Sequence, residues 1–300
     1  MFNLEKEHTQ LKADMMLVLV TLCWGISYFM MDICLDEMDP MTLNAYRFLG
    51  AFAVAALVSF RRIRNVNRTT LKYAFFIAIS LVFVYIGATY GVKYTTQSNA
   101  GFFCATSTIF TPIIVFVFRK IVPEKKLILA VILCTVGLAL MSLDVNMHIA
   151  KGDWLCLLCG FSYGFDLLIT EIAVEKEEVN AFQLGVYQLL FTGLFMLVLS
   201  FVLETPCLPQ SPKCWISVIF LAIFCTGLAF IIQCVAQQYT SASHVGVIFA
   251  LEPVFAGIVA FFLAGERLLP RGYFGAVLML ISLLVMEVDF SYNKNKVTKK

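Results

Sequence analysis

Charge is scarce in this 300-residue chain, and that scarcity excludes most classes of soluble protein. Only 14% of the residues are Asp, Glu, Lys or Arg, whereas 60% are hydrophobic, and the mean hydropathy is +0.86. A soluble globule of this size needs more polar residues to cover its surface. The charges also stand in short clusters between long apolar runs, as in proteins embedded in lipid. We therefore predict an all-α integral membrane protein whose surroundings are the lipid bilayer.

Several chemical signatures are missing as well. The chain has three histidines and contains no GxxxxGK[ST] nucleotide loop, no HExxH motif and no GxSxG motif. No basic run with interleaved aromatic residues indicates nucleic acid. We therefore predict no ATPase domain on this chain, no cofactor, no metal and no nucleic-acid partner. A membrane enzyme, or a scaffold or sensor without transport activity, is kept as the alternative function.

The ten cysteines do not predict a disulfide framework, because most of them lie inside apolar runs as small hydrophobic residues. Cys156 and Cys159 form a CxxC pair with no second pair of ligands. Cys207 and Cys214 flank a proline-containing loop, and the sequence leaves open whether they are bridged. The first 14 residues lack a basic region followed by a cleavage site, so we expect the first apolar run to be a permanent span.

Ten apolar runs have the length that a helix needs to cross a bilayer, roughly 20 residues. They lie near residues 15–34, 41–60, 72–92, 99–118, 126–143, 153–172, 181–203, 214–236, 244–264 and 271–288. With the N-terminus in the cytoplasm, 16 Lys and Arg residues fall on the inner side and 5 on the outer side. The positive-inside rule then places both termini in the cytoplasm of a cell-membrane protein.

The two halves of the chain repeat each other at an offset of 145 residues. The segments 94–118 and 239–263 share eight identical positions of 25, among them Tyr94/Tyr239 and Gly101/Gly246. A weaker repeat relates the segments that begin at Trp24 and Tyr163. Because each half holds five spans, an odd number, the second copy enters the membrane from the opposite side. We therefore predict two inverted five-helix repeats, which is an architecture of alternating-access carriers.

The repeat gives the expected division of the chain. It runs as an N-terminal cytoplasmic tail (1–14), a first repeat (15–143), a second repeat (153–288) and a basic cytoplasmic tail (289–300). Pro112 and Pro253 each remove a backbone donor inside a span, so each is expected to bend its helix and free the carbonyl four residues earlier. The two prolines are not equivalent, because Pro253 aligns with Thr108, one turn before Pro112.

With these features together, the chain resembles the EamA family of the drug/metabolite transporter superfamily over about residues 14–288. The stretch QCVAQQYTSASHVGVIFALEPVFAGIVAFFLAGERL (233–268) carries most of the resemblance. The first half adds Trp24–Gly25, Arg47 and the segment 94–112. The resemblance implies a ten-span secondary carrier of a small molecule, often an exporter of amino acids, metabolites or drugs. It implies neither the cargo nor the coupling ion, and the oligomeric state stays open, a homodimer included.

One position departs from the repeat. The ninth span ends at Gly265–Glu266, whereas the fourth ends at Arg119–Lys120, so Glu266 has no counterpart in the first half.

Glu252 and Arg47 are the charged residues that most need an explanation. A carboxyl group inside a span faces protein or a water-filled cavity, so Glu252 beside Pro253 is either a gate or proton-coupled group, or a buried structural partner. Arg47 either lines the substrate cavity, where it would suit an anionic or zwitterionic cargo, or extends to the membrane interface. Its candidate partners are Glu252, Asp166 and Glu171.

Other polar residues within the spans complete the predicted site. Asp166 is a cavity candidate, whereas Glu171 lies near the cytoplasmic end of its span. Tryptophan and tyrosine within a span seek a hydrogen-bond partner or a cavity, and we assign this place first to Trp24. Tyr28, Thr89 and His244 are weaker candidates. The predicted cavity or gating residues are Trp24, Arg47, Tyr85, Asp166, Tyr187, Gln233 and Glu252, although Gln233 could instead join helices together with Gln237.

Overall fold

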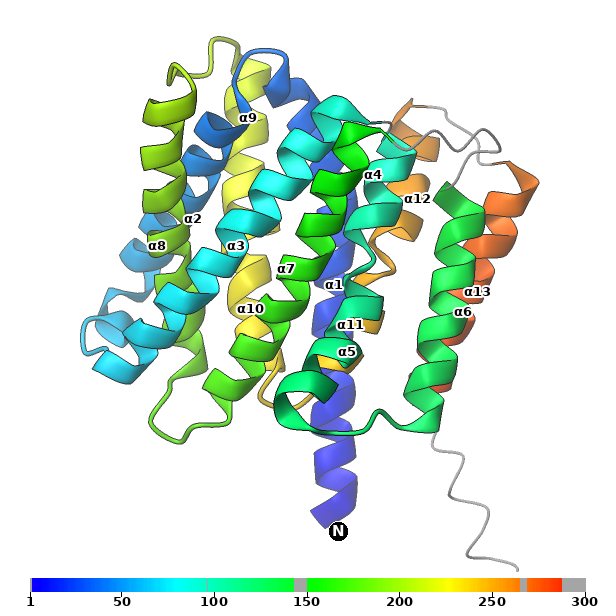
Figure 1. The fold of residues 1–300 in the computed structure, drawn as a ribbon. Helices are drawn as coiled ribbons and strands as arrows, with labels where there is room; N and C mark the ends of the chain where they lie inside the picture. The colour runs from blue at the N-terminus through cyan, green and yellow to red at the C-terminus, as the bar shows by residue number, and fades with distance from the viewer. Residues whose placement is uncertain (1, 96, 143–149, 265–268, 288–300) are drawn as a thin grey trace, which may run out of the picture.

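The computed structural model describes residues 2–95, 97–142, 150–264 and 269–287, and in these residues every regular element is a helix (Figure 1). In chain order the helices are α1 (Phe2–Leu35), α2 (Pro40–Ile63), α3 (Arg68–Tyr94), α4 (Gln97–Cys104), α5 (Ser107–Arg119), α6 (Lys125–Ser142), α7 (Lys151–Val174), α8 (Ala181–Leu203), α9 (Pro212–Phe220), the π-helix η1 (Leu221–Leu228), α10 (Ala229–Ala236), α11 (Ala242–Phe249), α12 (Glu252–Ala264) and α13 (Pro270–Glu287). The C-terminal tail and Glu266 lie outside the described residues.

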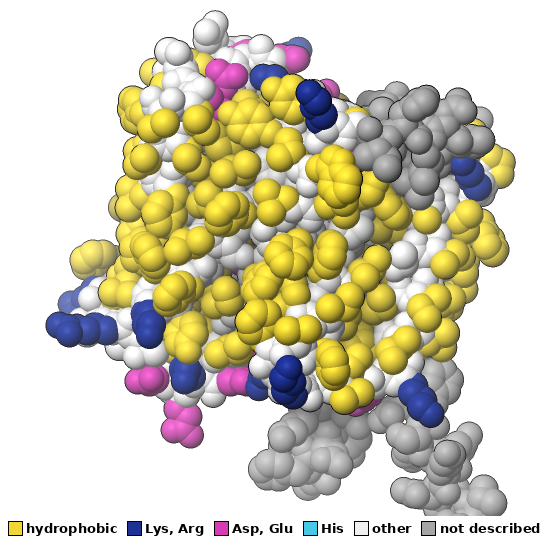
Figure 2. All heavy atoms as spheres, in the orientation of Figure 1, with side chains coloured by type: hydrophobic (Ala, Val, Ile, Leu, Met, Phe, Trp, Pro, Cys, Tyr) yellow, Lys and Arg dark blue, Asp and Glu magenta, His cyan; other side chains and the backbone are white. Residues whose placement is uncertain are grey.

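The predicted membrane-spanning class is confirmed. Eight helical stretches of the described chain are long and apolar enough to cross a membrane. Two further apolar helices of 18 residues, α6 and α13, pack side by side at one edge of the bundle (Figure 1). Figure 2 shows an apolar belt on the visible face, with Lys, Arg, Asp and Glu gathered toward its two ends. The boundaries of the tails and repeats stay a prediction, although α1 is helical from Phe2, well before the expected start of the first span.

Three of the expected spans are not single helices. The fourth consists of α4 and α5, the ninth consists of α11 and α12, and the eighth runs through α9, η1 and α10. Adding the repeat offset of 145 to the bounds of α4 and α5 gives the observed bounds of α11 and α12. The same tight turn follows α4 in the fourth span and α11 in the ninth span. In the first, Thr106 N–H donates to the Phe103 carbonyl, and in the second, Leu251 N–H donates to the Ile248 carbonyl. The two breaks are therefore equivalent features of the repeat.

The expected effect of the prolines holds for only one of them. α11 ends at Phe249, the residue whose carbonyl Pro253 cannot bond, but the equivalent first break has Thr108 at the matching position, so a proline is not required for the break. Pro253 is the second residue of α12, a position whose N–H has no partner within the helix in any case. Pro112 lies inside α5, more than a turn after the first break. Pro253 thus fits the first turn of α12, the second half-helix of the ninth span. It does not bend a continuous helix.

The end of the bundle opposite the N-terminus is fastened by two carboxylates, which we call the far-end clamp (Glu37 and Glu204). Glu204, just after α8, accepts hydrogen bonds from Met41 N–H (2.8 Å), Thr42 N–H (2.8 Å) and the Tyr90 hydroxyl (3.0 Å). It therefore satisfies backbone donors at the start of α2, and its negative charge interacts favourably with the positive end of that helix dipole.

Glu37 makes the reciprocal contact in the loop between α1 and α2. Its carboxylate accepts hydrogen bonds from the backbone N–H groups of Gln210 (2.9 Å) and Ser211 (3.0 Å), directly before α9. Hydrogen bonding from the Ser211 side chain and from these backbone groups holds the pKa of Glu37 below its ordinary value. The two loops of this end thus hold each other through two carboxylates.

We expect Glu204→Ala to lower the free energy of unfolding by about 2 kcal/mol, the upper range for loss of a helix cap. The reason is that two backbone donors of α2 lose their partner together. Thermal unfolding in detergent measures the effect. The matched control is Glu177→Ala, an exposed residue in the loop after α7, which should leave the midpoint unchanged. Equal midpoints for the two variants would show that the clamp does not stabilise the bundle.

Candidate functional site

A cavity of about 100 Å³ lies at the centre of the bundle. By the measure on which one water needs roughly 10–15 Å³, it has room for several waters or a small metabolite. Its walls come from α1, α2, α3, α7 and α10 and from both broken spans. The lining residues used below are Trp24, Tyr28, Arg47, Tyr85, Ser107, Tyr163, Phe230, Phe249, Glu252 and Pro253.

Both helix breaks open onto this cavity. Cys104, Ala105 and Ser107 line it from the first break, and Glu252 and Pro253 line it from the second. In membrane proteins, irregular backbone is tolerated where it is buried in protein or lines a cavity. Carriers with inverted repeats bind their substrates at such breaks, where the positive N-termini of half-helices face anionic groups. The N-terminus of α5 begins at Ser107 and brings no acidic side chain of its own.

Arg47 supplies the positive charge of the cavity. Two turns into α2, it is only 2% exposed, so it does not reach the membrane interface. Its Nε donates to Thr226 Oγ1 (2.8 Å), and the guanidinium carbon lies 5.0 Å from the centre of the Tyr85 ring. These contacts orient the guanidinium with hydrogen-bond and cation–π interactions.

None of the carboxyl groups expected as partners forms an ion pair with Arg47. Within the described residues, the ion pairs closer than 4.0 Å involve Arg119 and His244, and Arg47 is in none of them. Glu252 lines the same cavity and acts on Arg47 at longer range. Burying a cation without a paired anion is costly, so the arrangement favours a negative group of a ligand beside Arg47.

Glu252 is placed by the second break. It is the first residue of α12, where a carboxyl group interacts favourably with the helix dipole. Tyr28 from α1 lines the same cavity, and its hydroxyl lies on the side of the Glu252 carboxyl group. Because Glu252 lines the cavity and is partly accessible, it offers an acceptor for a positive or hydrogen-bond-donating group of a ligand.

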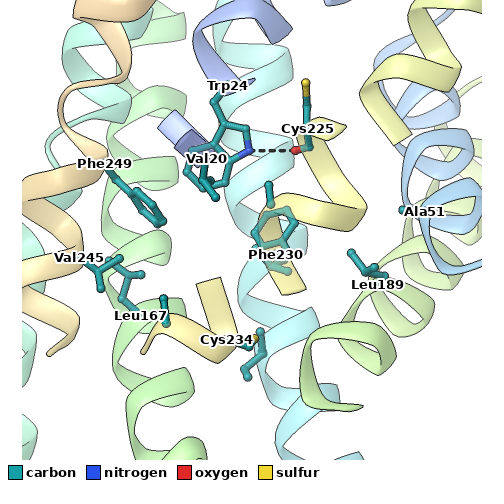
Figure 3. Close-up of a cluster of buried hydrophobic side chains, with 14 of the residues drawn as sticks. Val20, Trp24, Ala51, Leu167, Leu189, Cys225, Phe230, Cys234, Val245 and Phe249 are labelled. Atoms are coloured by element: carbon teal, nitrogen blue, oxygen red, sulfur yellow. Dashed lines mark hydrogen bonds between the residues drawn. The ribbon is translucent and has the colours of Figure 1, made fainter. Parts of the chain in front are cut away.

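Aromatic side chains form one wall of the same cavity. Figure 3 shows Trp24 pointing toward η1, where its Nε1 donates to the Cys225 carbonyl at 2.9 Å. The Trp24 ring centre lies 4.7 Å from that of Phe249 and 5.8 Å from that of Phe230. Tyr163 stacks on Phe249 at 6.0 Å with nearly parallel planes. Such rings accept apolar groups on their faces and stabilise cations.

Asp166 and Gln233 lie behind the aromatic wall instead of in the cavity. Gln233 Nε2 donates to Asp166 Oδ2 (2.9 Å), and Gln233 Oε1 accepts from the Tyr163 hydroxyl (3.1 Å). Gln237 Nε2 donates in turn to the Leu167 carbonyl (3.0 Å). This polar network joins α7 to α10, and Tyr163 is the member that also lines the cavity.

Packed side chains fill the space between the cavity and the N-terminal end of the bundle. Leu167, Cys234 and Val245, which Figure 3 shows below Trp24, are fully buried. Nearer that end, His244 Nε2 lies 3.8 Å from Asp14 Oδ2 and joins α11 to α1. Arg119 joins α5 to α7 through Glu175 at 2.8 Å and Glu171 at 3.5 Å. Glu171 is therefore a structural partner of Arg119, as its place near the helix end indicates.

Two other residues of the predicted site lie away from the cavity. The Tyr187 hydroxyl donates to the Ile63 carbonyl (3.0 Å) at the N-terminal end of the bundle. Pro112 is buried and lies at the wall of a groove between α5 and α6. Cys207 and Cys214 are free thiols, and Cys207 instead donates to the Glu37 carbonyl at 3.5 Å.

The π-helix η1 is the part of the site that sequence reasoning missed. Its wider turn presents the Cys225 carbonyl to Trp24 and the Thr226 hydroxyl to Arg47. The segment LAIFCTGL has no proline and reads as ordinary apolar helix, so its pattern carries no signal of the widened turn. Such π-helical turns are frequent at functional sites.

Comparison with known proteins agrees with this architecture. A profile of the EamA-like transporter family matches the chain twice, over residues 11–143 and 150–288. A protein of Archaeoglobus fulgidus named as an uncharacterized transporter is 31% identical over 280 residues, which cover 93% of this chain and 87% of that protein. The transporter YoaV of Bacillus subtilis, also named uncharacterized, is 19% identical over 94% of this chain and 99% of its own length.

A crystal structure shares the fold with a TM-score of 0.78 at 13% identity, over 92% of this chain and 96% of that one. The repeated helix breaks, the central cavity between them and the two matched family segments describe one architecture. The chain belongs to the EamA-like transporter family and is a multi-pass membrane transporter.

Proposed function

We propose that the protein carries small zwitterionic metabolites, with α-amino acids as the model class, by alternating access. The observation that carries this proposal is the buried guanidinium of Arg47, which faces a cavity without a carboxylate in ion-pair contact in the described chain. The carboxylate of an amino acid would complete that pair beside the N-terminus of α5. A bidentate guanidinium–carboxylate contact is among the strongest hydrogen-bonded pairs in proteins.

The other groups of the cavity suit the remaining parts of such a cargo. The ammonium group would lie toward Glu252 and the Tyr28 hydroxyl, and the side chain would lie against Trp24 and Phe249. An anion alone would leave Glu252 without a cationic partner, and a cation alone would leave Arg47 without an anionic partner. The pairing therefore favours a zwitterion over either singly charged class.

The expected location and direction belong to this proposal. The protein lies in the cell membrane with both termini in the cytoplasm, as the 16-to-5 distribution of Lys and Arg indicates. It works as an exporter, and coupling by protons, by exchange or by the cargo gradient alone is compatible with the site. The relatives are named as transporters and not as enzymes, and no step of bond chemistry is part of the proposal.

Counterflow in proteoliposomes tests the proposal. Vesicles loaded with one unlabelled compound are diluted into the labelled form, and amino acids, nucleosides and cationic dyes are compared. We expect accumulation of label with one or more amino acids, above that of protein-free vesicles. Accumulation of a dye or nucleoside with none of the amino acids would contradict the assignment of cargo class but not the carrier function.

A further inference from the structure

An apolar groove of about 410 Å³ lies on the outside of the bundle between α5 and α6, separate from the central cavity. Ile109, Ile113 and Phe116 line it from α5, and Ile128 and Ile132 line it from α6. Ile113 is 52% exposed and Ile132 is 54% exposed. The groove therefore opens away from the protein, in the apolar belt where lipid chains are the solvent.

The groove exists because α6 packs against α13 and only weakly against α5. The backbones of α6 and α13 are in close contact at Gly137 and Gly275, where neither residue has room for a Cβ. The connecting segment 120–124 ties α6 to α5 at one end only. At 1.5 Å of rise per residue, the α5 wall (109–116) extends about 10 Å and the α6 wall (127–132) about 8 Å, which is long enough for several methylene groups of an acyl chain.

Positive charge gathers where the groove meets the N-terminal end of the bundle. The segment 119–126, RKIVPEKK, contains four basic residues and one acidic residue. Arg119 is paired with Glu175. In the described part of the chain, Lys120, Lys125 and Lys126 have no carboxylate within 4.0 Å, and Lys120 and Lys125 are exposed.

An apolar groove that ends in unpaired lysines has the shape and charge of one lipid molecule. Basic pockets at the end of membrane helices bind anionic headgroups. We propose that this groove is a binding site for an anionic phospholipid, with an acyl chain between α5 and α6 and the phosphate beside Lys120, Lys125 and Lys126. The lipid fills the gap that α6 leaves beside the broken fourth span. The site does not depend on which cargo the central cavity carries.

Native mass spectrometry of delipidated, detergent-solubilised protein tests the site. Dioleoyl phosphatidylglycerol and dioleoyl phosphatidylcholine share their acyl chains and differ in headgroup charge. We expect the first phosphatidylglycerol to bind at least about tenfold more tightly than the first phosphatidylcholine. Lys120→Gln/Lys125→Gln/Lys126→Gln should reduce this preference to less than about threefold.

Two further variants separate the groove from general surface charge. Arg61→Gln/Arg62→Gln/Arg64→Gln removes three charges at the C-terminal end of α2, at the same end of the bundle, and should keep the full preference. Ile128→Trp places a bulky apolar side chain in the groove on a residue that is 45% exposed, so folding is spared and the first lipid of either headgroup should be lost.

Three results would overturn the proposal. These are equal affinity of the wild-type protein for the two lipids, an equal effect of the lysine and arginine triple variants, and an unchanged first lipid in Ile128→Trp. A wild-type dimer that Ile128→Trp converts to a monomer would assign the groove to a second copy of the chain instead.

Discussion

Arg47→Met is expected to abolish transport while leaving the protein folded. The substitution removes the buried positive charge that we assign to the cargo carboxylate. Loss of such a contact costs at least about 2 kcal/mol of binding, which is roughly a 30-fold loss of affinity. Counterflow of the amino acid that the wild-type protein carries measures the change.

Folding should survive because a buried cation without a paired anion contributes little to stability. Replacing buried charge with an apolar side chain of similar volume is often neutral or stabilising. The Cys225 carbonyl keeps its bond from Trp24, and the Thr226 hydroxyl loses one donor. We therefore expect an unfolding midpoint at or above that of the wild-type protein.

The matched control is Arg64→Met, an exposed residue just after α2. It should keep both transport and stability. A fully active Arg47→Met variant would remove Arg47 from the binding site. A variant that is inactive because it unfolds would make Arg47 a structural residue.

Gly25→Ala is expected to destabilise the protein through a single added methyl group. Gly25 lies at the crossing of α1 and α12, where an added Cβ would lie 2.8 Å from Ala256 N and 2.9 Å from the Phe255 carbonyl carbon. These are backbone atoms, so α12 itself must move. Such overpacking costs about 1–3 kcal/mol. Because α12 begins with Glu252, transport should fall together with the unfolding midpoint.

Gly101→Ala is the matched control for that prediction. Gly101 lies in α4, and an added Cβ there meets no atom within 4 Å. Alanine is favoured over glycine in helices by about 1 kcal/mol, so this variant should be equally stable or more stable. Equal unfolding midpoints for the two variants would show that α1 and α12 are not held in close contact in the membrane.

The number of spans and the two-fold repeat could be predicted because both are written locally in the sequence. Apolar runs have a length set by the bilayer, and the offset of 145 residues is visible in the aligned segments. The same offset relates the bounds of the two broken spans. The place of the break was harder to predict, because a turn at residues 105–106 that contains no proline sets it in the first half.

The composition of the cavity could be predicted only in part. Trp24, Arg47, Tyr85 and Glu252 do line it. Asp166 does not, because the rotation of α7 about its axis points it toward Gln233, and no local pattern reports that rotation. Thr226, which accepts the hydrogen bond from Arg47 Nε, lies 179 residues away on a π-helix, so a motif within one span cannot predict this contact.

Binding of three matched ligands tests the central claim most directly. These are a transported amino acid, the amine that lacks its carboxyl group and the acid that lacks its amino group, each titrated against wild-type protein, Arg47→Met and Glu252→Gln. We expect the wild-type protein to prefer the complete amino acid over both analogues. Arg47→Met should no longer distinguish the amino acid from the amine, and Glu252→Gln should no longer distinguish it from the acid. If both variants lower the affinity for all three ligands by the same factor, the cavity does not recognise the two charges of a zwitterion separately, and the account is wrong.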